Sequence, residues 1–182
     1  SADHIGLGGI DTMEQMAKVK SVVPETVFKH GYAILNAEDD LVYAMKKNLH
    51  CNIALFSMDE TNPRIIEHCK SGGDAAVFEN GYVTIMKGIW KMRVIKVAEV
   101  PITYGGKSLH NVMNCLPAVL STYFWRNIEI DDIKLALQTF IPSATQTPGR
   151  LNMFQFKQFK FLVDFAHNPA GLELLCDFVS KM

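Results

Sequence analysis

The stretch GYAILNAEDDLVYAMKKNLHCNIALFS, residues 31–57, points directly to a fold class. It contains two apolar runs with the length of buried strands, YAILN (32–36) and NIALFS (52–57). Between them lies a segment that Asp39 or Asp40 can cap as a helix. A strand, a helix and a second strand form the repeating unit of parallel sheets. The stretch therefore predicts an α/β fold.

The same alternation continues on both sides of this stretch. Thr12 and Gln15 have the spacing of a capping box and predict a helix over residues 12–28. Pro63 suits the first turn of another helix, which the glycine pair at 72–73 would end. We therefore expect a mostly parallel sheet with flanking helices.

The pattern changes after this glycine pair. Asn80-Gly81 lies between two runs of alternating polarity, which is the strongest short signal for a β-hairpin. A third run of the same kind follows within IWKMRVIKVAEVPI, residues 89–102. Residues 74–103 are therefore expected to form a small antiparallel sheet.

Two helices are predicted after this sheet. Residues 109–126 form a long apolar run, in which Pro117 predicts a kink or a broken turn near Met113. Residues 131–140 are apolar at helical spacing and predict a shorter amphipathic helix.

The segment PSATQTPGR, residues 142–150, is the best candidate for a linker, because it is rich in proline, glycine and hydroxyl side chains. Residues 1–141 then form one domain. Residues 151–182 begin with a hairpin over about 152–164 and end in an amphipathic helix. So short a segment cannot bury a core alone, so it either packs on the first domain or begins a second one.

Composition excludes several classes of function. The chain has a net charge of −1 and no basic block, so no nucleic-acid partner is expected. It contains no apolar run of about 18 residues, so no membrane partner is expected. Its four cysteines are scattered without a C-x-x-C motif, which favours the reduced thiols of a cytoplasmic protein over a zinc site.

The first candidate site residues lie near the amino end. Lys20 falls within an apolar stripe of the predicted helix, where its ammonium needs an anion, a lowered pKa or a route to water. It is either a lysine that extends to solvent from the edge of the stripe or one that faces a site. Asp3-His4 could bind a divalent cation or form a loop hydrogen bond.

Other candidates lie at the predicted helix start and at the linker. Asn111 and Asn114 are three residues apart in HNVMN (110–114), on one helix face, and could cap the helix or bind a polar ligand. Arg150 ends the linker and is either a surface residue or a guanidinium that clamps a phosphate when two domains close.

The stretch VDFAHNPAG, residues 163–171, delivers three polar side chains at the end of a predicted strand: Asp164, His167 and Asn168. In α/β sheets, ligands bind beyond the carboxyl ends of strands, and an acidic residue there can hold ribose hydroxyls. The alternative is that Asp164 caps the helix that Pro169 begins.

Taken in order, these motifs resemble the Mur ligase superfamily of ATP-dependent amide ligases, which includes folylpolyglutamate synthase. The matching stretches are DH (3–4), AKVK (17–20), NAEDD (36–40), HNVMN (110–114), PGR (148–150) and VDFAHNPAG (163–171). A finer resemblance, to the branch that makes cyanophycin, lies in SADHIGLGGIDT (1–12), FSMDETNP (56–63), ENGYVTIMKG (79–88) and SATQTPGRLNMF (143–154). The resemblance covers essentially the whole chain.

The resemblance implies a role for each candidate. His4 would bind Mg²⁺, and Lys20, which is often carbamylated in such ligases, would help to hold that metal. The binding site for ATP would be made by Asn111, Asn114, Arg150, Asp164, His167 and Asn168. Within it the asparagines would lie near the adenine, Arg150 would reach the phosphates, and Asp164 would hold the ribose.

The resemblance also implies a reaction. ATP would phosphorylate a carboxylate, and an amine would then attack the acyl phosphate to form an amide. In the cyanophycin-making branch the substrates would be arginine and an aspartate-containing polymer, and Lys20 and Arg150 would be the catalytic residues. Exposed apolar faces would also allow self-association into a homo-oligomer.

Departures from the family pattern limit what the chain is expected to do. The phosphate loop G-x-x-x-x-G-K-[ST] is absent, so residues 1–141 resemble a partial central domain. Residues 151–182 resemble the truncated start of a carboxyl-terminal domain. We therefore expect a fragment that is inactive alone. The alternatives are another Mur-type ligase, acting on a peptidoglycan precursor or a folate, and a non-catalytic scaffold.

Overall fold

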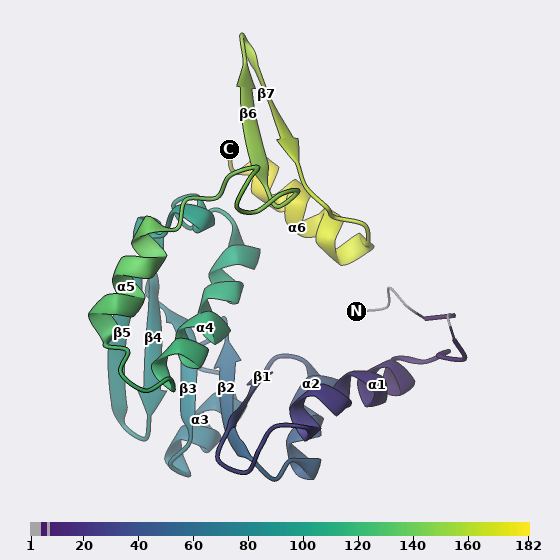
Figure 1. Ribbon diagram of the computed structural model, residues 1–182, viewed down its shortest axis with the longest axis vertical. Helices are drawn as coiled ribbons and strands as arrows, with labels where there is room; N and C mark the ends of the chain where they lie inside the picture. The colour runs from purple at the N-terminus through teal and green to yellow at the C-terminus, as the bar shows by residue number, and fades with distance from the viewer. Residues whose placement is uncertain (1–4, 7) are drawn as a thin grey trace.

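The computed structural model describes residues 5–6 and 8–182 and shows two parts (Figure 1). The sheet part, up to residue 141, is a five-stranded sheet flanked by helices. The hairpin part, residues 151–182, is a two-stranded sheet with one helix. The predicted α/β class is confirmed.

The helices and strands follow the sequence patterns closely. The sheet part contains α1 (Met13–Glu25), β1 (Tyr32–Asn36), α2 (Asp40–Ala44), η1 (Met45–Asn48), β2 (Asn52–Ser57), α3 (Pro63–Lys70), β3 (Asp74–Glu79), β4 (Tyr82–Lys87), β5 (Trp90–Lys96), η2 (Val97–Glu99), η3 (Pro101–Thr103), α4 (Leu109–Tyr123) and α5 (Ile130–Thr139). The hairpin part contains β6 (Asn152–Phe156), β7 (Phe159–Val163) and α6 (Pro169–Ser180). Residues 142–150, between α5 and β6, contain only turns and irregular structure.

The strands of the sheet part form one mixed sheet in the order β1-β2-β3-β4-β5. β1, β2 and β3 pair in parallel, whereas β3, β4 and β5 pair antiparallel. The antiparallel strands are thus not a separate sheet as expected, because β3 also pairs with β2. The predicted turn at Asn80-Gly81 is confirmed, with positive φ angles of 50° and 83° that suit a tight hairpin.

Helices cover both faces of this sheet. Successive strand side chains point to opposite faces, so Ala54 and Ala76 lie in the core cluster under α4, whereas Leu55 lies in the cluster with Ile65 of α3. On α4, Leu116 is fully buried. The predicted broken turn near Met113 is wrong, because α4 is continuous through Pro117 and its buried face holds it on the sheet.

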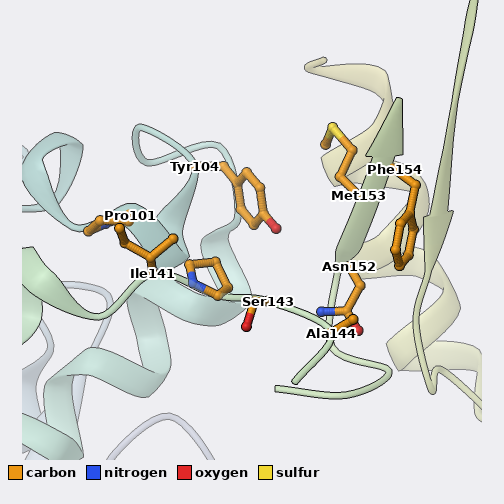
Figure 2. A pocket seen from close by; sticks show the side chains of 9 residues that line it. Pro101, Tyr104, Ile141, Ser143, Ala144, Asn152, Met153 and Phe154 are labelled. Atoms are coloured by element: carbon orange, nitrogen blue, oxygen red, sulfur yellow. The ribbon is translucent and has the colours of Figure 1, made fainter. Parts of the chain in front are cut away.

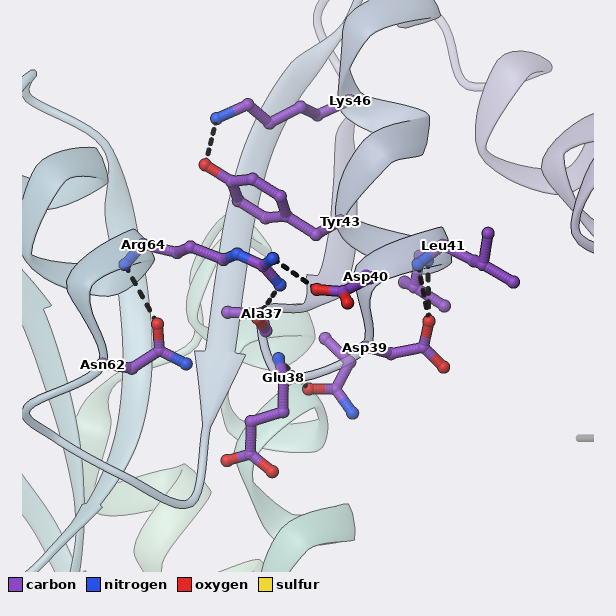
Figure 3. Close-up of polar contacts among 11 residues, drawn as sticks. Ala37, Glu38, Asp39, Asp40, Leu41, Tyr43, Lys46, Asn62 and Arg64 are labelled. Atoms are coloured by element: carbon purple, nitrogen blue, oxygen red, sulfur yellow. Dashed lines mark hydrogen bonds and ion pairs between the residues drawn. The ribbon is translucent and has the colours of Figure 1, made fainter. Parts of the chain in front are cut away.

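Polar contacts fix the helices at the ends of β1 and β2 (Figure 3). The predicted cap Asp39 accepts hydrogen bonds from the backbone amides of Leu41 and Val42, both at 2.9 Å. Arg64 of α3 donates to the carbonyl of Ala37 at 2.9 Å and pairs with Asp40. These contacts join α2 and α3 at the edge of the sheet where β1 ends.

The hairpin part is small, and the phenylalanine side chains of its two strands are exposed. Phe154 stacks on Phe161 across the strands with ring centroids 4.9 Å apart, and Phe156 contacts Phe159 at 5.2 Å. These pairs match the register of β6 and β7. Among the described residues, no helix has the length and apolar character that crossing a membrane requires.

Candidate functional site

A cavity of about 470 Å³ lies where the hairpin part meets the amino end of α4. Its lining includes all the residues predicted to bind the nucleotide: Asn111, Asn114, Arg150, Asp164, His167 and Asn168. The volume is typical of sites for small molecules. The structure thus brings together side chains from α4, the end of the linker and the turn before α6.

The amino end of α4 supplies the two asparagines. Ser108 is the residue before the helix, and its side chain forms no capping hydrogen bond. Asn111 does not cap the helix either, because its Nδ2 donates to the carbonyl of Ile102 at 2.8 Å. This bond fixes the amide plane of Asn111 at the amino end of α4, where backbone N–H groups favour polar or anionic ligands.

Arg150 is exposed at the edge of the cavity. Its guanidinium carbon lies 5.6 Å from the ring centroid of Phe165. The backbone there is fixed, because Phe165 donates its amide proton to the carbonyl of Gly149 at 2.8 Å. Gly149 has a φ of 68°, which favours glycine. No carboxylate of the described residues pairs with Arg150, so its charge is available to an anion.

Asp164 organises the base of the hairpin part. Its Oδ2 accepts a hydrogen bond from the Leu151 amide at 2.9 Å, and its Oδ1 accepts one from the Ala166 amide at 2.8 Å. The alternative that Asp164 caps the last helix is wrong, because Asn168 is the cap and accepts from the Gly171 amide at 2.7 Å. Each carboxylate oxygen of Asp164 keeps a second lone pair for a ligand hydroxyl.

His167 is oriented by its own loop. Its Nδ1 lies 2.9 Å from the carbonyl oxygen of Phe165. Since a carbonyl only accepts, Nδ1 is the donor in this contact. The imidazole also lies against the Phe165 ring, with centroids 5.1 Å apart.

Lys20, one of the two residues predicted to bind the metal, lies away from this cavity. Lys20 is exposed and lines a separate hollow of about 460 Å³ between α1 and β1. Its neighbour Val23 on the apolar stripe is 73% exposed, because α1 contacts little besides α2. Lys20 therefore has a route to water, which is one of the alternatives given above. His4 lies outside the described residues.

No complete metal site is present in the described part of the chain. Within residues 5–6 and 8–182, no group of three or more His, Cys, Asp or Glu side chains is placed to hold a metal ion. These residues thus supply no protein cage for a metal ion, whereas Mg²⁺ usually binds through one or two side chains together with substrate phosphates.

Sequence reasoning missed Tyr104. Its hydroxyl donates to the carbonyl of Leu151 at 2.5 Å, across 47 residues of sequence. Its ring contacts Phe178 of α6 with centroids 5.1 Å apart. The partner of the hydroxyl is a backbone atom, so no sequence motif marks the contact.

Comparison with known proteins agrees with the fold. The model of the Mur ligase middle domain matches residues 1–122. This match covers more than half of the chain, so the chain belongs to the Mur ligase family. The predicted resemblance to that family is confirmed.

Individual relatives show which branch of the family the chain resembles. The chain is 48% identical over 181 residues to a cyanophycin synthetase of Synechocystis sp., a match that covers 100% of this chain and 21% of the relative. It is 48% identical over 179 residues to a cyanophycin synthetase of Geminocystis herdmanii, with coverage of 98% and 20%. A UDP-N-acetylmuramate–L-alanine ligase of Acetivibrio thermocellus is 26% identical over 158 residues, with coverage of 84% and 29%. The chain thus spans about one fifth of the length of the cyanophycin synthetases that it matches.

Proposed function

We propose that this chain is part of an ATP-dependent amide ligase that joins arginine to the side-chain carboxylates of an aspartate-containing polymer. The observation that carries the proposal is the single cavity lined by Asn111, Asn114, Arg150, Asp164, His167 and Asn168. These residues come from three separate segments, and each offers a group suited to one part of a nucleotide.

Arg150 is the phosphate-binding residue of this proposal. A guanidinium presents several N–H donors in a fixed plane and binds phosphate oxygens in a bidentate manner. Arg150 is exposed to the cavity and forms no ion pair with the described carboxylates. It therefore does not have to break an internal salt bridge to bind the triphosphate.

The other side chains suit the base and the sugar. The Nδ2 of Asn111 is engaged with Ile102, so its carbonyl oxygen is the group that can accept from an exocyclic amine of adenine. Asp164 is held by two backbone amides and still has lone pairs directed away from them, which suits ribose hydroxyls. His167 and Asn168 shape the same wall of the cavity.

The proposed reaction has two steps. The carboxylate of the polymer attacks the γ-phosphorus of ATP, forming an acyl phosphate and releasing ADP. The amine of arginine then attacks the acyl carbon, phosphate leaves, and the amine loses a proton. Arg150 contributes by stabilising negative charge on the phosphoryl group during transfer. The substrates are proposed from the 48% identity to cyanophycin synthetases.

Magnesium is part of the proposal for the complete ligase only. His4 and Lys20, the latter as its carbamate, are the residues proposed to hold it, and when bound it would supply charge to neutralise the phosphates. The described residues do not form a complete donor set. We also propose that the 182-residue chain alone neither hydrolyses ATP nor ligates, because its sequence contains no G-x-x-x-x-G-K-[ST] loop.

The place of action proposed is the cytoplasm, where ATP is available and thiols stay reduced. Cys51, Cys69, Cys115 and Cys176 are all free in the structure.

The test is phosphate release by the complete ligase supplied with ATP, magnesium, arginine and a short aspartate–arginine primer. A UDP-muramyl precursor with L-alanine is the matched control, because the chain is also 26% identical to a UDP-N-acetylmuramate–L-alanine ligase. Release that requires both primer and arginine supports the proposal. Phosphate release only with the muramyl precursor would overturn the proposed substrates but keep the ligase reaction. No release from folded protein would favour a non-catalytic scaffold.

A further inference from the structure

One side chain that does not line the nucleotide cavity, Tyr104, contacts both the sheet part and the hairpin part. Tyr104 follows η3, and its hydroxyl donates to the carbonyl of Leu151 at 2.5 Å. Figure 2 shows Tyr104 reaching from the sheet part toward β6, whose Asn152 and Phe154 line the other wall of a hollow of about 290 Å³. The tyrosine thus lies at the joint between the parts.

The side of the joint that carries Tyr104 is held firmly. Thr103 is fully buried, and its hydroxyl lies 2.6 Å from the carbonyl oxygen of Val97. Tyr104 itself has a φ of 53°, a conformation that a non-glycine residue adopts only when its surroundings impose it. Asn111 of the candidate site donates to the carbonyl of Ile102 in the same loop. The loop therefore presents the phenol in one direction.

The side that receives the hydrogen bond is equally constrained. Leu151 has its carbonyl bound by Tyr104 and its amide bound by Asp164. Its φ of 49° is unfavourable for a leucine. The two hydrogen bonds therefore keep Leu151 from adopting a more favourable backbone conformation. Leu151 follows Arg150 directly, so the direction in which Arg150 leaves the backbone depends on this conformation.

The contact between the rings adds to the hydrogen bond. The ring of Tyr104 contacts Phe178, which is 2% exposed, near the carboxyl end of α6. Burial raises the pKa of the Tyr104 hydroxyl, so the group stays protonated and remains a donor. A Tyr104→Phe variant would keep the ring contact and remove only the bond to Leu151.

We propose that Tyr104 is a positioning residue that sets Arg150 and Asp164 in place across the nucleotide cavity by holding the Leu151 carbonyl. The inference rests on the function proposed above. The inference goes beyond that function because it assigns a role to a side chain that does not line the cavity. Tyr104 influences how the phosphates bind only through the position of Arg150.

The proposal predicts a selective loss. In the complete ligase, Tyr104→Phe should raise KM for ATP by roughly 3- to 10-fold, the range expected for one lost hydrogen bond. KM for arginine should not change, because no part of the arginine site is invoked. Tyr123→Phe is the matched control, because Tyr123 is partly exposed on α4 and contacts the neighbouring Phe124 instead of the joint.

A double-mutant cycle separates positioning from a general structural effect. If Tyr104 acts through Arg150, then Tyr104→Phe should have little further effect on KM for ATP in an Arg150→Ala background. Effects that simply add would overturn the proposal. An unchanged KM for ATP in Tyr104→Phe alone would overturn it as well.

Amide hydrogen exchange tests the joint without nucleotide. In Tyr104→Phe, the Leu151 and Phe165 amides should exchange faster than in the wild type, whereas amides of β2 and β3 should not change. An unchanged exchange rate of the Leu151 amide would contradict the proposal that Tyr104 fixes the Leu151 carbonyl. A wild-type ligase that does not bind ATP would refute the proposed function, and the exchange data would still decide whether Tyr104 holds Leu151.

Discussion

Asp164 accepts a hydrogen bond from the Leu151 amide at 2.9 Å, which closes the base of the β6-β7 hairpin at the edge of the candidate site. The other oxygen of the carboxylate accepts from the Ala166 amide, so Asp164 joins the first residue of the hairpin part to the turn before α6. The side chain proposed to hold ribose is therefore also a structural element, and its two roles predict different responses to substitution.

Replacing Asp164 with asparagine should destabilise the hairpin part. An asparagine offers one acceptor oxygen in place of two, so its NH₂ group would face a backbone amide. We expect Asp164→Asn to lower the free energy of unfolding by about 1–3 kcal/mol, measured by urea denaturation. Asp177→Asn, which breaks only a surface pair with Lys181, is the control and should change it by less than about 1 kcal/mol. Equal losses in both variants would contradict the structural role of Asp164.

Removing the guanidinium of Arg150 should weaken binding of the triphosphate. A charged hydrogen bond to phosphate contributes about 1.5–3 kcal/mol, so Arg150→Ala should reduce ATP affinity of the complete ligase by roughly 10- to 100-fold. Titration calorimetry with ATP and with adenosine measures this, and adenosine affinity should not change. Arg126→Ala, an exposed arginine between α4 and α5, is the matched control. A parallel loss of adenosine affinity would assign Arg150 to the base instead.

Acid should remove a stabilising contact of Glu79 in the sheet. The hydrogen bond from Lys91, 2.5 Å long, is the largest of the effects that lower the pKa of Glu79 from 4.5 to about 2. Because the pKa is lower in the folded state, the stabilisation is full above pH 4.5 and is lost as pH falls toward 2.

The variant that tests this linkage is Glu79→Gln. We expect it to cost on the order of 2 kcal/mol at pH 7, and the difference from the wild type should shrink as pH falls from 4.5 to about 2. Urea denaturation at several pH values measures it. Glu67→Gln, at an exposed glutamate of α3, should show no such trend. A difference that stays constant with pH would show that Glu79 acts by packing alone.

Loss of the Asn152 side chain should open the end of the linker. Asn152 is buried, accepts from the Gly149 amide at 2.7 Å and donates to the Thr147 carbonyl at 3.0 Å. These bonds hold the backbone on both sides of Arg150, so Asn152→Ala should speed tryptic cleavage after Arg150 several-fold. Mass spectrometry of the products follows the cut. Gln146→Ala, an exposed position of the same linker, should leave the rate unchanged.

Local patterns predicted the elements of this fold well. The apolar runs 32–36 and 52–57 coincide with β1 and β2, and the capping box at Thr12 is present. The partner of each strand was harder to predict, because pairing depends on residues far apart in sequence. Residues 74–103 were therefore expected as a separate sheet, although β3 pairs with β2 and extends the same one.

For the candidate site, too, the lining side chains could be predicted from sequence, whereas the contacts that position them could not. The resemblance of short motifs was enough to predict six side chains that line one cavity. The contacts that hold them are not visible in sequence, because Leu151 and Ile102 take part through backbone atoms. Lys20 was placed in an apolar stripe by helical spacing, but spacing does not tell whether another element covers that stripe.

The two alanines under α4 give the core an unexpected influence on ligand recognition. Ala54 and Ala76 offer only methyl groups to the helix, so the distance of α4 from the sheet depends on their small size. A valine at either position would lift the helix and carry Asn111 and Asn114 with it. The spacing of groups around the cavity therefore depends on buried residues that do not line it. Variation at these alanines would change the affinity for a ligand of the cavity while the surface of the protein stayed the same.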